Sequence, residues 1–166
     1  MSNIGFKLEN GVGVITLNRP DKFNSFVRQM AFDLQAALDE CEKNNEVRAI
    51  YLTGEGKAFC AGQDLAEAID PNQTELTKIV EEHYNPIIER LRKIEKPVVC
   101  GVNGVAAGAG ANIALMPKDV LSSLLKLEEM IESDNSFREK IINSYSKIYN
   151  LKRWCGLIPR FAQLEK

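Results

Sequence analysis

The chain lacks several features that mark common classes of protein. Its 166 residues include one histidine and four cysteines, and the cysteines are widely spaced with no C-x-x-C pair. This pattern argues against a zinc site and a disulfide framework, so we expect no metal and reduced thiols in a cytoplasmic protein. No segment reaches the roughly 18 apolar residues of a membrane span, and the first residues lack the basic start and apolar stretch of a signal peptide. We therefore expect no membrane association.

An excess of charge of either sign is also missing. The net charge is −2, and charged residues of both signs, 27% of the chain, are interspersed. Because a nucleic-acid-binding domain usually presents a basic face, we expect no nucleic-acid partner. The hydrophobic content of 45% is sufficient for the core of one soluble unit.

The first part of the chain predicts a hairpin, a helix and a strand. Alternating residues from Phe6 to Glu9 precede Asn10-Gly11, a strong hairpin turn signal, and the strand resumes over Val12 to Leu17. Apolar residues at spacings of three and four predict an amphipathic helix from about Val27 to Lys43. A β-branched run then predicts a strand over 47–53.

A second helical pattern and a further strand follow. Helical spacing of apolar residues extends over 72–96, where Asn72 and Glu75 form a capping signal. Pro86 interrupts the pattern, so we expect a kink or two abutting helices. The strand predicted over 97–102 completes an α/β arrangement.

Two turns of small residues are the most informative feature. One is Ala58-Phe-Cys-Ala-Gly-Gln-Asp-Leu65 and the other is the glycine- and alanine-rich stretch from Gly101 to Asn112. Each lies between a predicted strand and a helix-compatible segment. Small side chains let a ligand approach the backbone, and free amides at a helix start carry partial positive charge, so the pair could form an oxyanion hole. The alternative is two tight turns that only permit close strand–helix packing.

Three ordered motifs resemble the crotonase superfamily (enoyl-CoA hydratase/isomerase). They are Phe-Cys-Ala-Gly-Gln-Asp-Leu at 59–65, the stretch from Lys96 to Leu115, and the opening from Val12 to Asn24. The Ala-Gly-Ala-Gly-Ala-Asn form is most similar to ring-epoxidised phenylacetyl-CoA isomerases. The resemblance implies a truncated right-handed spiral of ββα units over residues 1–116. Residues 117–166 are not matched to the family, apart from Gly156-Leu-Ile-Pro159, which resembles a segment that precedes a catalytic acid in some isomerases. Their periodicity predicts an α-helical tail.

The resemblance also implies a binding site for a CoA thioester, with no permanently bound cofactor. The backbone amides of Gln63 and Ala109 would polarise the thioester carbonyl, each contributing on the order of 3 kcal/mol. The loop at 22–24 would border CoA, with Lys22 either a phosphate or adenine contact or a solvated surface residue. The other expected binding residues are Phe23, Asn24, Ala61, Gly62, Asp64, Leu65, Gly108 and Gly110.

Catalytic acids are missing where the family carries them. Asn112 occupies the position of the first hydratase glutamate, and the second glutamate and the isomerase base belong to the unmatched tail, where Arg160 stands at an acid position. An isomerase needs only one general base, so isomerisation is favoured over hydration. We expect Asp64 to cap the following helix, and we do not expect His83 to act as the base because no acidic partner is evident.

The remaining cysteines and the tail leave alternatives open. Cys60 and Cys100, next to the turns, are expected to be inert packing residues. The tail is consistent with a truncation, a fusion, a frameshift or a designed replacement. The chain is therefore an acyl-CoA isomerase-like enzyme, a non-catalytic CoA-binding or assembly module, or a chimeric scaffold. The resemblance implies a homo-oligomer, but the family's oligomerising C-terminal helices do not match here.

Overall fold

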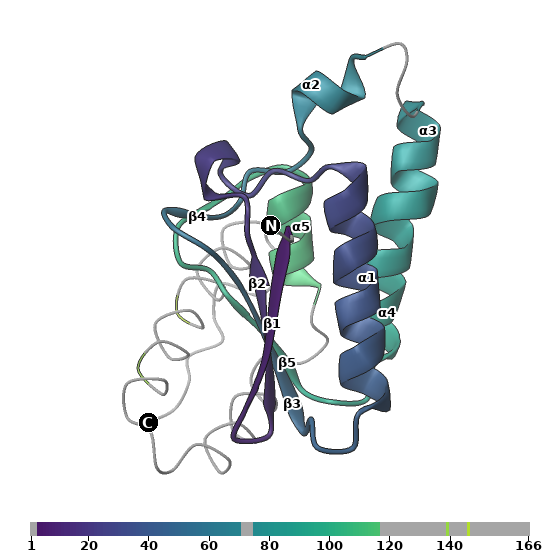
Figure 1. Ribbon diagram of the computed structural model, residues 1–166. Coiled ribbons are helices and arrows are strands. Elements are labelled where there is room, and N and C mark those ends of the chain that lie inside the picture. The colour runs from purple at the N-terminus through teal and green to yellow at the C-terminus, as the bar shows by residue number, and fades with distance from the viewer. Residues whose placement is uncertain (1–2, 71–74, 117–138, 140–145, 147–166) are drawn as a thin grey trace, which may run out of the picture.

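The computed structural model describes residues 3–70, 75–116, 139 and 146, and these form a mixed α/β structure (Figure 1). The main sheet has the order β1 (Ile4–Glu9), β2 (Val12–Leu17), β3 (Ala49–Gly54) and β5 (Val98–Gly101). The first two strands are antiparallel, whereas β2 and β5 both run parallel to β3. The predicted α/β class is confirmed.

The hairpin and the central strand follow from their sequences. Asn10 and Gly11 both have positive φ, 50° and 81°, as a two-residue hairpin turn of the favoured twist requires. In β3, Ala49 to Leu52 are all buried, including residues on both faces of the strand. Strands inside a parallel sheet are covered on both faces, which explains a continuous apolar run rather than alternation.

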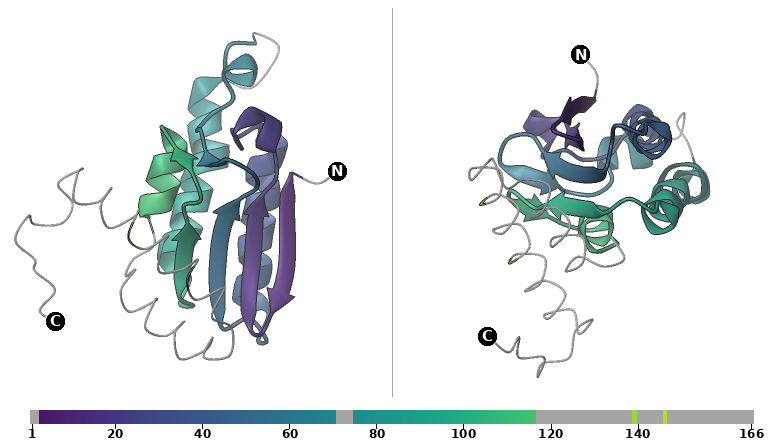
Figure 2. Two further views of the ribbon diagram at one scale, coloured as in Figure 1. Left: turned by 90° about the vertical axis from the view of Figure 1, so that its left-hand side faces the viewer. Right: turned by 90° about the horizontal axis from the view of Figure 1, so that it is seen from below.

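Helix α1 (Arg28–Lys43) packs on the sheet through the predicted apolar stripe, with Met30, Leu34, Leu38 and Cys41 fully buried. Both views in Figure 2 show α1 and α4 (Asn85–Lys93) on the same side of the sheet. A bidentate ion pair joins the two helices, since Arg90 Nε and Nη2 donate to the carboxylate of Asp39 at 2.6 and 3.0 Å.

The interruption predicted at Pro86 is a π-helical turn. The chain passes from α3 (Leu76–Lys78) through the π-helix η2 (Ile79–Tyr84) into α4. Proline has no N–H, so the carbonyl of Glu82, four residues earlier, cannot receive its α-helical hydrogen bond. The Gln35 side-chain amide donates to that carbonyl instead, at 2.8 Å. Residue 72 of the predicted capping signal lies outside the described residues.

The two glycine-rich segments are not simply turns, which corrects the sequence interpretation. The first begins with a short strand, β4 (Ala58–Cys60), and the second contains another, β6 (Val105–Ala106). These two strands pair in parallel as a second sheet. Strands of two or three residues are too short to produce an alternation pattern. Helices α2 (Leu65–Ala68) and α5 (Ala109–Leu115) follow them.

Parallel pairing decides where these segments lie. Because β3 and β5 are parallel, and β4 and β6 also, both glycine-rich segments leave the sheets at their carboxyl ends. Ligands of α/β proteins commonly bind outside that edge. Within the described ranges no helix is long and apolar enough to cross a membrane. The predicted helical tail, 117–166, lies outside those ranges except for residues 139 and 146.

Candidate functional site

The first turn is fixed by an isolated parallel bridge between Phe26 and Gln63. Phe26 N–H donates to the Gly62 carbonyl at 2.7 Å, and Asp64 N–H donates to the Phe26 carbonyl at 2.9 Å. In a parallel bridge the residue between these two bonds directs its own N–H and C=O to the opposite side. Among the described residues, nothing accepts a hydrogen bond from the Gln63 N–H.

The second turn leads into α5. Gly108, at its N-cap, has a φ of 52°, and Ala109 is the first helical residue. First-turn N–H groups have no acceptor inside their own helix. Ala107 N–H donates to the Cys60 carbonyl and Gly110 N–H to the Ala107 carbonyl, both at 3.0 Å. The Ala109 N–H, like that of Gln63, has no hydrogen-bond acceptor in the described part of the chain.

Glycine is what allows the two turns to touch. A Cβ on Gly62, whose φ is +97°, would lie 3.0 Å from the Ala107 oxygen and 3.3 Å from the Ala109 nitrogen. A Cβ on Gly110 would lie 2.2 Å from the Cys60 oxygen. The fold therefore brings the backbone before Gln63 directly beside the amide of Ala109, although the two residues are far apart in the sequence.

The loop at 22–24 is attached to the first turn, because Ala61 N–H donates to the Phe23 carbonyl at 2.9 Å. Phe23 is 52% exposed and Lys22 is also exposed, so both side chains are available to a ligand. Asn24 differs, because its side chain is completely buried and fully used inside the protein. It donates to the carbonyls of Glu55 and Ala58 at 2.9 and 2.8 Å and accepts from Arg19 N–H at 2.8 Å.

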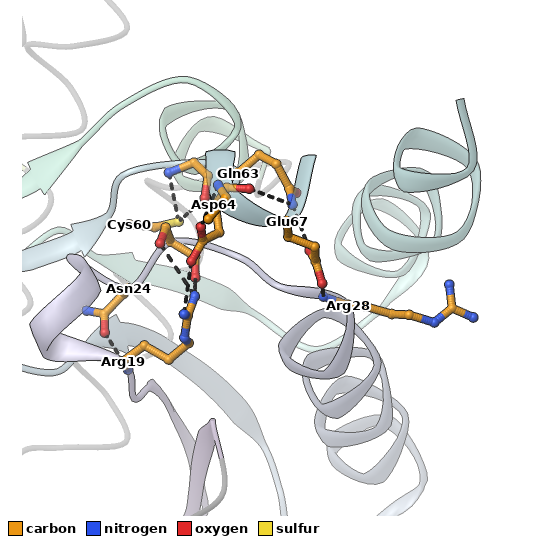
Figure 3. A network of polar contacts seen from close by, with 10 residues as sticks. Arg19, Asn24, Arg28, Cys60, Gln63, Asp64 and Glu67 are labelled. Carbon is orange, nitrogen blue, oxygen red and sulfur yellow. Dashed lines mark hydrogen bonds and ion pairs between the residues drawn. The ribbon is translucent and has the colours of Figure 1, made fainter. Parts of the chain in front are cut away.

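Asp64 has the capping role expected from the sequence. Its Oδ1 accepts from Ala66 N–H at 3.1 Å at the start of α2, and its Oδ2 pairs with Arg19 Nη2 at 3.0 Å (Figure 3). Burial opposes ionisation, but the hydrogen bonds from Arg19 and Ala66 outweigh it and lower the pKa of Asp64. Arg19 was not identified from the sequence, because its partner is 45 positions away. Leu65, beside Asp64, is 72% exposed.

The nucleophilic and basic side chains near the turns are held in inactive forms. Cys60 is buried and its Sγ accepts from Gly62 N–H at 3.3 Å, while burial raises the pKa of the thiol to about 11. His83 is fully buried, and no described residue is a hydrogen-bond partner of its ring nitrogens. Burial lowers the pKa of His83, which keeps the imidazole neutral. Cys100 is buried as well.

Asn112, the residue matched by sequence to the first hydratase glutamate, has a neutral side chain. Asn112 is exposed on α5, one turn after Ala109. Arg160 lies outside the described residues. Within the described ranges, no group of three histidine, cysteine, aspartate or glutamate side chains could hold a metal ion.

A family profile and the sequences of known proteins point to one family. A sequence profile for "Enoyl-CoA hydratase/isomerase" matches residues 7–121. The 1,2-epoxyphenylacetyl-CoA isomerase of Escherichia coli (strain K12) is 49% identical over 111 residues, covering 65% of this chain and 42% of that protein. The short-chain-enoyl-CoA hydratase of Clostridium acetobutylicum is 36% identical over 118 residues, covering 69% and 44%.

Solved structures are similar over the same region. The enoyl-CoA hydratase of Mycobacterium smegmatis has a TM-score of 0.65 at 30% identity, covering 70% of this chain and 46% of that one. The chain thus spans less than half the length of these relatives. The residues matched by the family profile, 7–121, include both glycine-rich turns. The chain belongs to the enoyl-CoA hydratase/isomerase family and has the crotonase fold.

Proposed function

We propose that this chain binds acyl-CoA thioesters and stabilises the enolate of the acyl group through the backbone amides of Gln63 and Ala109. The observation that carries the proposal is the pair of N–H groups without acceptors in the described residues, on two turns so close that a Cβ added to Gly62 would lie 3.3 Å from the Ala109 nitrogen. Fixed donors of this kind stabilise a developing oxyanion because they need no reorganisation, and each is worth about 3 kcal/mol. The thioester is a substrate, not a resident cofactor.

Within that chemistry, isomerisation is favoured over hydration. Hydration in this family uses paired carboxylates, and Asn112 removes the first of them. Proton transfer in an isomerase needs a single base. Asp64 is engaged by Arg19 and Ala66, and His83 is buried, so neither supplies the base. The family position of the isomerase base falls in residues 117–166.

A second candidate is a non-catalytic module that binds CoA thioesters or serves in assembly. Non-acidic residues at the two family-matched positions, Asn112 and Arg160, favour it. In this case the chain binds the thioester without turnover. Assembly into a homo-oligomer, implied by the family resemblance, and a cytoplasmic location, inferred from the cysteine pattern, remain predictions under both candidates.

The test replaces Ala109, the first residue of α5, by proline. Proline is well tolerated at that helical position; it removes the N–H and puts its ring Cδ where the hydrogen pointed. Ala111→Pro, in the same helical turn, is the matched control. Calorimetry with phenylacetyl-CoA, crotonyl-CoA and free CoA measures binding, and deuterium exchange at the α-carbon of phenylacetyl-CoA measures enolate formation.

We expect the wild-type chain to bind thioesters more tightly than free CoA. In Ala109→Pro this preference should fall by about fivefold, and any exchange should slow by about a hundredfold, while Ala111→Pro retains both. If the wild-type chain binds thioesters but does not exchange the α-carbon proton, the second candidate, the non-catalytic module, is correct. If the wild-type chain binds thioesters no better than free CoA, the proposal is wrong.

A further inference from the structure

The side chain of Gln63 is held at both ends of its amide group. Tyr84 Oη donates to Gln63 Oε1 at 2.8 Å, and Gln63 Nε2 donates to Glu67 Oε2 at 2.9 Å. Tyr84 is the last residue of the π-helix η2, whereas Glu67 lies on α2. Figure 3 shows Gln63, Asp64 and Glu67 gathered at the start of α2, next to the start of α1.

Glu67 is itself fixed by a third element. Both of its carboxylate oxygens accept from the backbone N–H of Arg28, at 2.9 and 3.1 Å. Arg28 is the first residue of α1, and the N-cap residue Val27 provides no side-chain cap. A carboxylate at a helix N-terminus satisfies a free N–H and interacts favourably with the helix dipole. Glu67 therefore caps α1 from α2 and is a rigid acceptor for Gln63.

Tyr84 is equally constrained. Its ring packs edge-on against Phe26, with centroids 5.8 Å apart and an interplanar angle of 61°. Phe26 is the residue whose backbone bridges Gln63. Burial is the main cause of a raised pKa for Tyr84, so its hydroxyl stays protonated and donates. The contact between the Tyr84 and Phe26 rings therefore positions the Tyr84 hydroxyl and also the Phe26 backbone that bridges Gln63.

We propose that Tyr84 is a positioning residue for the Gln63 backbone amide, acting through the Gln63 side chain; this inference rests on the proposed function. The bridge to Phe26 fixes the backbone on either side of Gln63, and the hydrogen bonds to Tyr84 and Glu67 fix its side chain. Together they remove the rotations that would turn the Gln63 N–H away from a ligand oxygen. Preorganised donors are effective because their direction is set before the ligand binds.

The first experiment is Tyr84→Phe, which removes the hydroxyl and keeps the ring that packs on Phe26. Calorimetry compares the affinities for phenylacetyl-CoA and for free CoA. We expect the thioester preference to fall by about fivefold, the loss typical of one hydrogen bond, with the affinity for free CoA unchanged. Amide hydrogen exchange should be faster at Gln63. A purely structural role would weaken both ligands alike and leave the preference unchanged.

The second experiment tests whether Tyr84 acts through Gln63. Gln63→Met removes both side-chain hydrogen bonds at similar volume, so the double variant Tyr84→Phe, Gln63→Met should lose no more preference than Gln63→Met alone. Additive losses would overturn the proposed route. Glu67→Gln should lower the preference as well, whereas Glu89→Gln, which breaks an exposed pair with Lys93, should not.

The two proposals fail in different ways. A wild-type chain without thioester preference overturns the proposed function, and the role of Tyr84 with it. A wild-type preference that Tyr84→Phe retains in full overturns the positioning role alone.

Discussion

Replacing Asn24 by alanine should destabilise the protein strongly, although Asn24 lies in a surface loop. Its side chain is 0% exposed and makes hydrogen bonds with Glu55, Ala58 and Arg19. Alanine would leave two carbonyls and one N–H without a protein partner. Each hydrogen bond contributes about 1 kcal/mol, and a buried group left unsatisfied costs about 1–3 kcal/mol. The expected loss is therefore about 3 kcal/mol or more.

The backbone of Asn24 adds to this loss. Its φ is 54°, in the left-handed region, where asparagine is far better tolerated than alanine. Urea unfolding followed by circular dichroism measures the change in free energy, and an unchanged slope with denaturant shows that the two native states are comparable.

The matched control is Asn103→Ala. Asn103 uses the same chemistry, because its Nδ2 also donates to two backbone carbonyls, those of Gly54 and Gly56, at 2.8 and 2.9 Å. Asn103 is exposed, so water can replace the lost donor and the expected loss is below about 1 kcal/mol. If both variants lose the same free energy of unfolding, burial does not determine how much the Asn24 hydrogen bonds contribute to stability, and the argument is refuted.

Three further predictions concern buried groups. The pKa of His83 lies below its ordinary value of 6.5, so the unfolded chain takes up a proton that the native chain does not; stability should fall as the pH drops below about 6.5, and less so in His83→Leu. Cys60, with a pKa of about 11, should resist a thiol reagent in the native state and react on unfolding; fast native labelling would contradict its burial. Gly110→Ala should cost about 1–3 kcal/mol because its Cβ would meet the Cys60 oxygen at 2.2 Å. Gly5→Ala, whose Cβ would lie 3.5 Å from its nearest neighbour, is the control and should change stability little.

Local patterns in the sequence were sufficient to predict the long helices and the first hairpin. The apolar stripe of α1, the Asn10-Gly11 turn and the interruption before Pro86 are each encoded within a few neighbouring residues. The strands β4 and β6 were not predicted, because elements of three and two residues owe their existence to each other. The cap of α1 could not be predicted either. Val27, the residue before the helix, does not cap it, and the capping carboxylate comes from Glu67 on α2.

For the site, the order of residues is enough to show which backbone segments carry small side chains, and the motifs around Gly62 and Gly108 identify the family. What those segments do depends on how the chain folds in three dimensions. Parallel pairing of β3 with β5 and of β4 with β6 brings Gly62 beside Ala109. The packing of the loop at 22–24 and of η2 against these segments turns Asn24 inward and sets Tyr84 on Gln63. These contacts join residues 21 to 47 positions apart, and no local pattern in the sequence specifies a distance across space.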